Sequence, residues 1–123
     1  MKIAVIGLGF VGLTLSSVLA SKGITTIGID SDRKKCSKIA KGIPTFFETN
    51  LEKILKKALR EKLIITNKLS SINNCDFVFI TVGTPQKKNG EIDLSFLKPV
   101  VSSVGKLISK NKKKPIILVK STV

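Results

Sequence analysis

Histidine is absent from the sequence, and cysteine occurs only twice, as Cys36 and Cys75. The first absence excludes histidine-based acid–base catalysis and histidine metal ligands within this chain. The two cysteines are far apart and show no paired spacing, so they predict neither a structural zinc site nor a disulfide framework. We therefore expect no metal site, and a reducing, cytoplasmic environment.

Acidic residues are also scarce, at 8 against 22 lysines and arginines, which gives a formal net charge of +14. Such a charge attracts phosphates, nucleic acids and anionic lipids. However, Arg33 and Arg60 are the only arginines, and the sequence has no stripe of arginine and aromatic residues typical of nucleic-acid binding. An excess of lysine beside abundant isoleucine is also what an AT-rich genome produces. We favour this compositional bias, and nucleic-acid binding stays as an alternative hypothesis.

Residues 3–21 carry no charge, a pattern that a hydropathy plot shares with membrane spans and signal peptides. Gly7, Gly9 and Gly12 interrupt this stretch early, and each lowers helix propensity by about 1 kcal/mol relative to alanine. A buried parallel strand followed by a packed helix produces the same uncharged pattern. We expect that arrangement and no membrane-spanning segment.

Short apolar runs alternate with segments of helical periodicity along the whole chain. The runs predicted to be strands are residues 2–6, 25–29, 63–66, 77–82 and 116–119. Helical segments are predicted at residues 10–22 and 32–41, from residue 49, at residues 69–74 and from residue 93. This order predicts an α/β fold of Rossmann-like, doubly wound type, with a mostly parallel sheet between two helical layers. Residues 1–123 are expected to form a single domain.

Three helices carry signals for where they begin. Asp32 is the predicted N-cap of the second helix, because a carboxylate accepts hydrogen bonds from the free N–H groups there. Thr49 and Glu52 form a predicted capping box for the third helix. Pro99 lies inside the segment that Asp93 opens and lacks a backbone donor, so that helix is predicted either to begin later or to kink.

The sequence GLGFVG at positions 7–12 follows a predicted strand and opens a predicted helix. In that context a G-x-G-x-x-G pattern is typical of dinucleotide binding. Gly7 permits the tight turn, Gly9 lets a diphosphate approach the backbone, and Gly12 lets the helix pack close to the sheet. The free N–H groups that begin the helix are expected to bind the diphosphate.

Asp30 ends the second predicted strand, where a carboxylate can bind the ribose hydroxyls of adenosine. Because a carboxylate repels a 2′-phosphate, Asp30 favours NAD over NADP as the cofactor. Arg33 and Lys35 weaken this preference, since a phosphate can pair with either of them. Asp32 is the better capping residue, so Asp30 is expected to be free for the ribose.

Three segments resemble the N-terminal signatures of the UDP-glucose/GDP-mannose dehydrogenase family: MKIAVIGLGFVG at positions 1–12, VGTP at 82–85 and KSTV at 120–123. The glycine loop is common to many dinucleotide-binding domains, whereas VGTP and KSTV after the fourth and fifth strands are more specific. Members of this family oxidise the C6 alcohol of a nucleotide sugar to a carboxylate with two NAD⁺. The resemblance therefore implies the NAD-binding part of a 6-dehydrogenase that acts on a UDP- or GDP-sugar.

The resemblance also implies roles for single residues. Val11 would touch the cofactor, and Lys35 would lie near its adenosine end. Thr84 would lie near the diphosphate and nicotinamide, and Thr122 near the nicotinamide and the reacting sugar. No catalytic residue is expected in this chain itself. The residues expected to bind the cofactor are Gly7, Gly9, Phe10, Val11, Gly12, Asp30, Lys35, Gly83, Thr84 and Thr122.

One segment departs from the family pattern. Many relatives carry Glu-Pro-Gly-Leu where this chain has Glu48, Thr49, Asn50 and Leu51. The glutamate and the leucine match, but the Pro-Gly turn is missing. The capping box is expected to replace that turn in starting the third helix.

The catalytic cysteine of the family belongs to its C-terminal half, so neither Cys36 nor Cys75 is expected to be catalytic. We expect residues 1–123 to be a truncated NAD-binding domain, without the central helix and substrate domain, that binds NAD and catalyses nothing alone. The whole protein is expected to be a homo-oligomer whose partners are NAD and a nucleotide sugar, with no nucleic acid or membrane. Two alternatives remain open: the NAD-binding domain of a 2-hydroxy- or 3-hydroxy-acid-type dehydrogenase, and a stand-alone nucleotide-sensing domain.

Overall fold

The computed structural model describes residues 1–120, so residues 121–123 are outside the description that follows. Its strands are β1 (Lys2–Ile6), β2 (Thr25–Ile29), β3 (Leu63–Thr66), β4 (Phe77–Ile80) and β5 (Ile116–Val119). They form one parallel five-stranded sheet in the order β3-β2-β1-β4-β5. The strand order reverses between β1 and β4, which is the position where open α/β sheets bind ligands. The predicted strands are confirmed, except that β4 ends at Ile80 rather than at residue 82.

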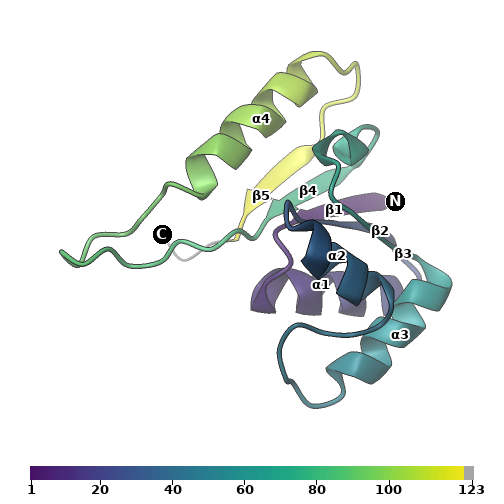
Figure 1. The fold of residues 1–123 in the computed structure, drawn as a ribbon. Coiled ribbons are helices and arrows are strands. Elements are labelled where there is room, and N and C mark those ends of the chain that lie inside the picture. Colours follow the sequence, from purple (N-terminus) through teal and green to yellow (C-terminus); the bar gives the residue numbers. More distant parts are fainter. Residues whose placement is uncertain (121–123) are drawn as a thin grey trace.

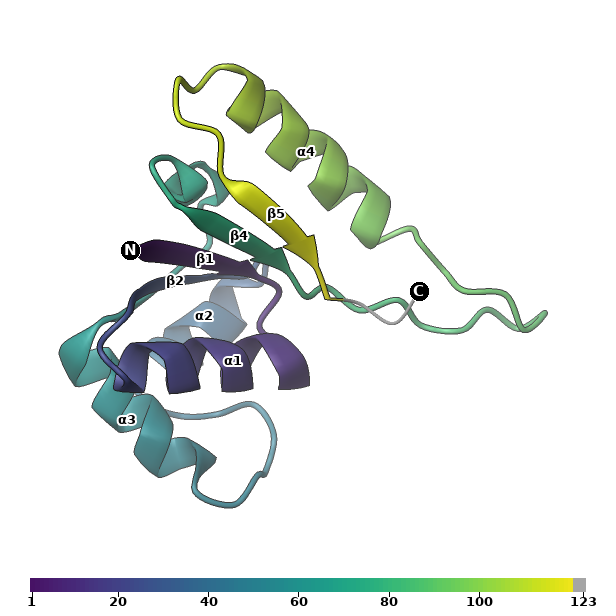
Figure 2. The ribbon, with the colours of Figure 1, turned by 180° about the vertical axis from the view of Figure 1, so that it is seen from behind.

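Helices cover both faces of this sheet, as predicted. They are α1 (Phe10–Ser21), α2 (Arg33–Ala40), α3 (Leu51–Glu61), the 3-10 helix η1 (Leu69–Ile72) and α4 (Leu97–Ser109). Figures 1 and 2 show α1, α2 and α3 on one side of the sheet and α4 on the other, which gives three layers. Both views also show the connection between β4 and α4 projecting away from the sheet.

Two apolar cores hold the layers together. Beneath α4 and η1, the strands contribute the buried side chains of Ala4, Ile6, Ile27, Ile29, Val78 and Ile80. The second core joins α1, α2 and α3 through Leu8, Leu13, Ala20, Ile39, Leu51, Leu55, Ala58 and Leu63. Burying one such aliphatic side chain stabilises the fold by about 1.5–3 kcal/mol.

The uncharged stretch near the amino terminus consists of β1 and α1, as expected. Residues 3–6 are all buried between the two helical layers, so no charged side chain is tolerated on either face of β1. Within residues 1–120, no helix combines the length and the apolar character that crossing a membrane requires.

The predicted N-cap of α2 is confirmed, whereas the capping box of α3 is wrong. The side chain of Asp32 accepts hydrogen bonds from the backbone N–H groups of Lys34 and Lys35, at 3.0 and 3.1 Å. In contrast, α3 begins at Leu51 after Asn50, whose side chain makes no capping hydrogen bond among the described residues.

Asn50 has a φ of 66°, in the left-handed region that glycine prefers and asparagine tolerates. The turn preceding α3 therefore has a left-handed residue, Asn50, at the position of the family's glycine. This backbone conformation moves the start of the helix beyond Thr49 and removes the geometry that a capping box needs.

Pro99 belongs to the first turn of α4, because this helix begins at Leu97. Backbone N–H groups in the first turn have no partner within a helix, so proline removes no helical hydrogen bond there. Of the two predicted outcomes, the structure has the later start.

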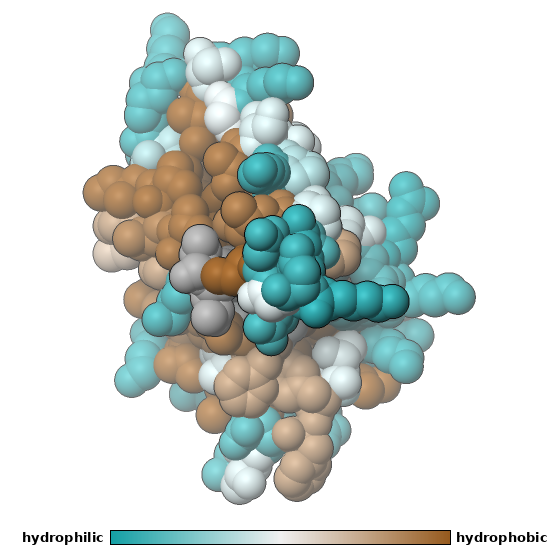
Figure 3. Space-filling model, turned by 90° about the vertical axis from the view of Figure 1, so that its left-hand side faces the viewer, coloured by the Kyte–Doolittle hydropathy of each residue, from teal (hydrophilic) through white to brown (hydrophobic). Residues whose placement is uncertain are grey.

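The strand β5 is poorly covered. All four of its side chains are exposed, with fractional exposures between 37% for Ile117 and 57% for Ile116. The helix α4 buries only Leu97 and Val104 among its residues. Figure 3 shows a broad hydrophobic area on the upper left of the face that it draws. A parallel strand is normally buried on both faces, so β5 is the least protected part of the described sheet.

Asp76 joins three segments at the amino ends of the strands. Its Oδ2 accepts the backbone N–H of Lys2 at 2.8 Å, and its Oδ1 lies 2.6 Å from the Nζ of Lys113. The hydrogen bond from Lys113, followed by that from Lys2, holds the pKa of this carboxyl below its ordinary value. The ionised form of Asp76 is therefore the form that the folded chain prefers.

Asp76→Asn is expected to lower the thermal midpoint of unfolding at pH 7. Because the folded pKa is lowered, the contribution of Asp76 is present above the unfolded pKa of about 3.9 and is lost as the pH falls through the folded pKa. The difference in midpoint between wild type and variant should therefore shrink as the pH falls below about 3.9 and through the lowered folded pKa. Calorimetry on both proteins across this range tests the prediction, and a difference independent of pH contradicts it.

Candidate dinucleotide-binding site

The loop between β1 and α1 turns sharply at Gly7. Its φ is +98°, and a Cβ there would lie 2.9 Å from the backbone nitrogen of Val82. The N–H of Gly7 donates to the carbonyl oxygen of Ile29 at 2.7 Å, which ties the turn to β2. Both the conformation and the lack of space require glycine at this position.

Gly12 brings the first turn of α1 against this loop. A Cβ at Gly12 would overlap the carbonyl oxygen of Gly7 and would lie 2.5 Å from the Oγ1 of Thr81. The close packing predicted for this glycine is present, and its immediate partners are the loop itself and the end of β4.

The start of α1 is open. Gly9 is its N-cap residue, and within residues 1–120 no side chain caps the helix there. A Cβ at Gly9 would meet none of the described atoms within 4 Å. The first N–H groups of a helix lack helical partners and carry partial positive charge, so they attract an anion. Phe10 and Val11 are exposed beside them. These groups suit a diphosphate in both space and charge.

Asp30, just after β2, is not free as the sequence suggested. Its Oδ2 accepts the N–H of Leu8 at 2.8 Å and lies 3.3 Å from the Nζ of Lys35. Its Oδ1 accepts the N–H of Asp32 at 2.9 Å, and its side chain is only 11% exposed. The tight turn before α2 directs the carboxylate back toward the glycine loop. Asp30 therefore supports the loop and borders the open space beyond it at the same time.

A crevice of about 700 Å³ lies beyond the carboxyl ends of β1, β2 and β4. Most of the predicted cofactor residues line it: Gly7, Gly9, Phe10, Val11, Asp30, Lys35, Gly83 and Thr84. Gly12 lies behind the loop and acts through packing. Thr122 lies outside the described residues. The side chains that the sequence reasoning missed are Leu8, Ser31, Thr81, Val82, Pro85, Phe96, Val100 and Lys120.

A smaller hollow of about 160 Å³ shares Asp30, Ser31 and Val100 with this crevice and adds Asn67 and Leu69. It has apolar walls and a polar edge, which is the composition that a flat heteroaromatic ring needs.

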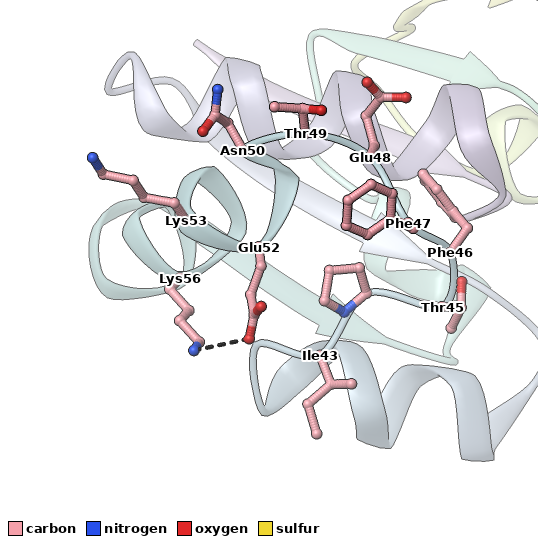
Figure 4. A pocket seen from close by; sticks show the side chains of 11 residues that line it. Ile43, Thr45, Phe46, Phe47, Glu48, Thr49, Asn50, Glu52, Lys53 and Lys56 are labelled. Atoms are coloured by element: carbon pink, nitrogen blue, oxygen red, sulfur yellow. Dashed lines mark ion pairs between the residues drawn. The ribbon is translucent and has the colours of Figure 1, made fainter.

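Another hollow, of about 850 Å³, lies away from the glycine loop. Figure 4 shows residues 43–50 curving around it, with Lys56 directed toward Glu52 in an ion pair of 3.0 Å. Phe47 in this loop is 94% exposed. The hollow is formed by one loop and the start of α3 and has no glycine loop. The ring of Phe46, in this loop, lies beside that of Phe10, which lines the crevice, with the ring centroids 5.2 Å apart.

The two cysteines are buried thiols outside the crevice. Burial raises the pKa of Cys36, with the charge of Asp30 as the next cause, and burial also raises the pKa of Cys75. Both groups therefore stay protonated at neutral pH and are poor nucleophiles. Residues 1–120 hold no cluster of three or more cysteine, aspartate or glutamate side chains arranged to bind a metal.

The parallel sheet with its change of strand order, the glycine loop at an open helix start and the acid after β2 together define a Rossmann-type dinucleotide-binding domain. The chain belongs to the UDP-glucose/GDP-mannose dehydrogenase family: the NAD binding domain of that family matches residues 1–123. The family and the cofactor NAD, both predicted from the sequence, are thereby confirmed.

Relatives of this family are similar over the whole chain. The UDP-glucose 6-dehydrogenase of Rickettsia typhi is 41% identical over 125 residues, which cover 100% of this chain and 28% of that protein. A ternary complex of GDP-mannose dehydrogenase from Pseudomonas aeruginosa superposes with a TM-score of 0.96 at 33% identity, covering 100% of this chain and 29% of that one. The structure of a UDP-glucose dehydrogenase from Pyrobaculum islandicum superposes with a TM-score of 0.93 at 30% identity. The match covers 99% of this chain and 29% of that one. The chain thus spans less than a third of the length of these relatives.

Proposed function

We propose that this chain supplies the NAD site of a nucleotide-sugar 6-dehydrogenase, which oxidises the C6 alcohol of a UDP- or GDP-sugar to a carboxylate with two NAD⁺. The open start of α1 beside Asp30 is the observation that carries the proposal, because it offers N–H donors to a diphosphate and an acceptor to a ribose. The names of the relatives, which act on UDP-glucose and GDP-mannose, support the substrate class.

Each part of the cofactor has a candidate partner. The first turn of α1 would bind the diphosphate, and Asp30 would bind the adenosine ribose. The small hollow beside Leu69 and Val100 would hold the adenine ring. The nicotinamide, which accepts hydride when NAD⁺ is bound, would then lie toward Thr84 and the end of β4.

Lys35 would have to adjust when the ribose binds. In the free chain its ammonium group lies 3.3 Å from Asp30 Oδ2, an atom that also accepts from Leu8. Asp30 Oδ1 already accepts one backbone N–H, so two ribose hydroxyls would compete with Lys35 for the carboxylate. Lys35 is exposed enough to move aside and to contact the ribose from the crevice.

The arrangement of the whole protein is also a proposal. Relatives are more than three times as long as this chain, which supports a single NAD-binding domain, residues 1–123, within a larger enzyme. We also propose that this enzyme is a homo-oligomer. The free, unpaired thiols of Cys36 and Cys75 support a reducing, cytoplasmic location.

Asp30→Ala is expected to weaken NAD binding by about tenfold or more, since it removes a charged acceptor from the ribose and an anchor from the glycine loop. Calorimetric titration of the chain with NAD and with NADP measures this effect. The affinity for NADP is expected to fall less than that for NAD. Asp30→Ala also removes the carboxylate that repels the 2′-phosphate of NADP.

Glu61→Ala is the charge-matched control, because Glu61 is exposed at the end of α3. It should bind NAD as the wild type does. A wild-type chain that binds no NAD, but binds DNA with steep salt dependence that Asp30→Ala leaves unchanged, would support the nucleic-acid alternative instead.

A further inference from the structure

Thr81, the residue after β4, contacts the glycine loop from the side opposite Asp30. Its side chain is buried, with only 8% of the residue exposed. Its Oγ1 donates to the carbonyl oxygen of Gly7 at 2.7 Å and lies 3.0 Å from that of Ile6. Its backbone N–H also donates to Ile6, at 2.8 Å. A single side chain therefore connects the end of β4 to the last residue of β1 and the first residue of the loop.

Hydrogen bonds tie the loop to the carboxyl ends of β2 and β4 and to the residues that follow them. The N–H of Gly7 donates to Ile29 of β2, and the N–H of Leu8 donates to the carboxylate of Asp30. The hydroxyl of Thr81 bonds the carbonyl of Gly7 from the other side. Because Gly7 has a φ of +98° and is free to adopt many conformations in isolation, these bonds select one of them.

The same hydroxyl lies against the first turn of α1. A Cβ on Gly12 would lie 2.5 Å from Thr81 Oγ1, so the helix approaches this oxygen as closely as its backbone allows. Gly12 is also pressed against the Gly7 carbonyl to which the hydroxyl donates. The loop, the helix start and the end of β4 therefore meet at one buried hydrogen bond.

We propose that Thr81 is a positioning residue for the diphosphate site. Its hydroxyl acts through Gly7 and Gly12 to set the direction in which the first N–H groups of α1 point. This inference rests on the proposed binding of NAD at the glycine loop. Donors that stabilise an anion must be aimed within narrow limits, so a small rotation of the helix start weakens binding while the fold persists.

The test compares ligands that do and do not reach the loop. Thr81→Val and Thr81→Ala remove the hydroxyl, and Thr81→Ser retains it. We expect both hydroxyl-free variants to bind NAD and ADP-ribose about tenfold more weakly than the wild type. Adenosine, which has no diphosphate, should bind all four proteins with the same affinity. Thr81→Ser should bind NAD within about twofold of the wild type. Titration by NMR covers the weak affinity of adenosine.

Thr26→Val is the matched control. Thr26 is a buried threonine near the amino end of β2, away from the glycine loop, and its hydroxyl donates to the carbonyl oxygen of Ile24 at 2.8 Å. It should lose thermal stability without losing NAD affinity. The alanine variant provides the comparison if the methyl group of valine, close to the Gly7 carbonyl, prevents folding.

Four outcomes overturn the proposal. Hydroxyl-free variants that bind ADP-ribose as tightly as the wild type show that the hydroxyl does not position the site. An equal loss for adenosine, or an equal loss in Thr26→Val, shows a general structural effect. A wild-type chain that binds no NAD refutes the proposed function itself, and that outcome is distinguishable because it appears before any variant is compared.

Discussion

Gly12→Ala is expected to abolish NAD binding and to lower the free energy of unfolding by about 3 kcal/mol, because the added methyl group has no space. A Cβ at this position would overlap the carbonyl oxygen of Gly7. That carbonyl cannot retreat easily, since Gly7 is hydrogen-bonded to β2 and to Thr81. The helix start would have to move away from the sheet, and the N–H groups of its first turn would move with it.

Denaturant titration and NAD calorimetry on the same preparation measure the two effects of Gly12→Ala. The control is Gly105→Ala, because Gly105 also lies inside a helix and a Cβ there would meet no described atom within 4 Å. That control should be neutral or more stable by up to about 1 kcal/mol, since alanine has the higher helix propensity. A Gly12→Ala chain with wild-type stability and affinity would show that the packing of α1 against the loop is unimportant.

Gly9→Ala is expected to weaken NAD binding by about a hundredfold while leaving the stability of the chain unchanged. Gly9 has a φ of −79°, which alanine adopts without strain, and a Cβ there would touch none of the atoms described in residues 1–120. The methyl group would instead occupy the space through which a diphosphate approaches the start of α1.

Comparison of Gly9→Ala with Gly12→Ala distinguishes a loss of NAD affinity alone from a loss of both affinity and folding stability. Thermal unfolding of Gly9→Ala should match the wild type within about 0.5 kcal/mol, and NAD titration should show little or no heat. If Gly9→Ala binds NAD normally, the diphosphate does not contact the glycine loop, and the proposed location of the cofactor is wrong. Testing adenosine on the same variant adds a check, since its affinity should be unaffected.

Much of the fold could be predicted from local pattern alone. The bounds of β1, β2, β3 and β5 were predictable to the residue, because each strand is a short run rich in aliphatic or β-branched residues. The glycine loop was predictable for a related reason. The conformation at Gly7 and the contact at Gly12 admit only glycine, and their spacing is therefore visible in the sequence.

The start of α3 was not predictable, because a local signal conflicted with the path of the chain. Thr49 and Glu52 have the spacing of a capping box, yet Asn50 adopts a left-handed conformation and becomes the residue that precedes the helix. Loop residues 43–50 reach Phe10 through Phe46, and such tertiary contacts decide where the chain turns. Capping preferences of about 1 kcal/mol do not outweigh them.

The hydrogen bonds that organise the site were also hidden from the sequence. Thr81 and Gly7 are 74 residues apart in the sequence, and no spacing rule connects them. Asp32 is the better cap, as the sequence indicates, but Asp30 is not free, because its carboxylate accepts the N–H of Leu8 in the neighbouring glycine loop. The sequence holds one signal for Thr81: it is a threonine directly after an apolar strand that borders the change of strand order.

The exposure of β5 affects how any measurement on this chain should be read. A strand whose four side chains all face solvent can gain cover from another molecule, and any such molecule that binds only the folded chain raises the apparent stability by mass action. The melting temperature of residues 1–123 then depends on the protein concentration and on which other molecules in the solution bind β5. Affinities and midpoints of the variants are comparable only at a single, matched concentration.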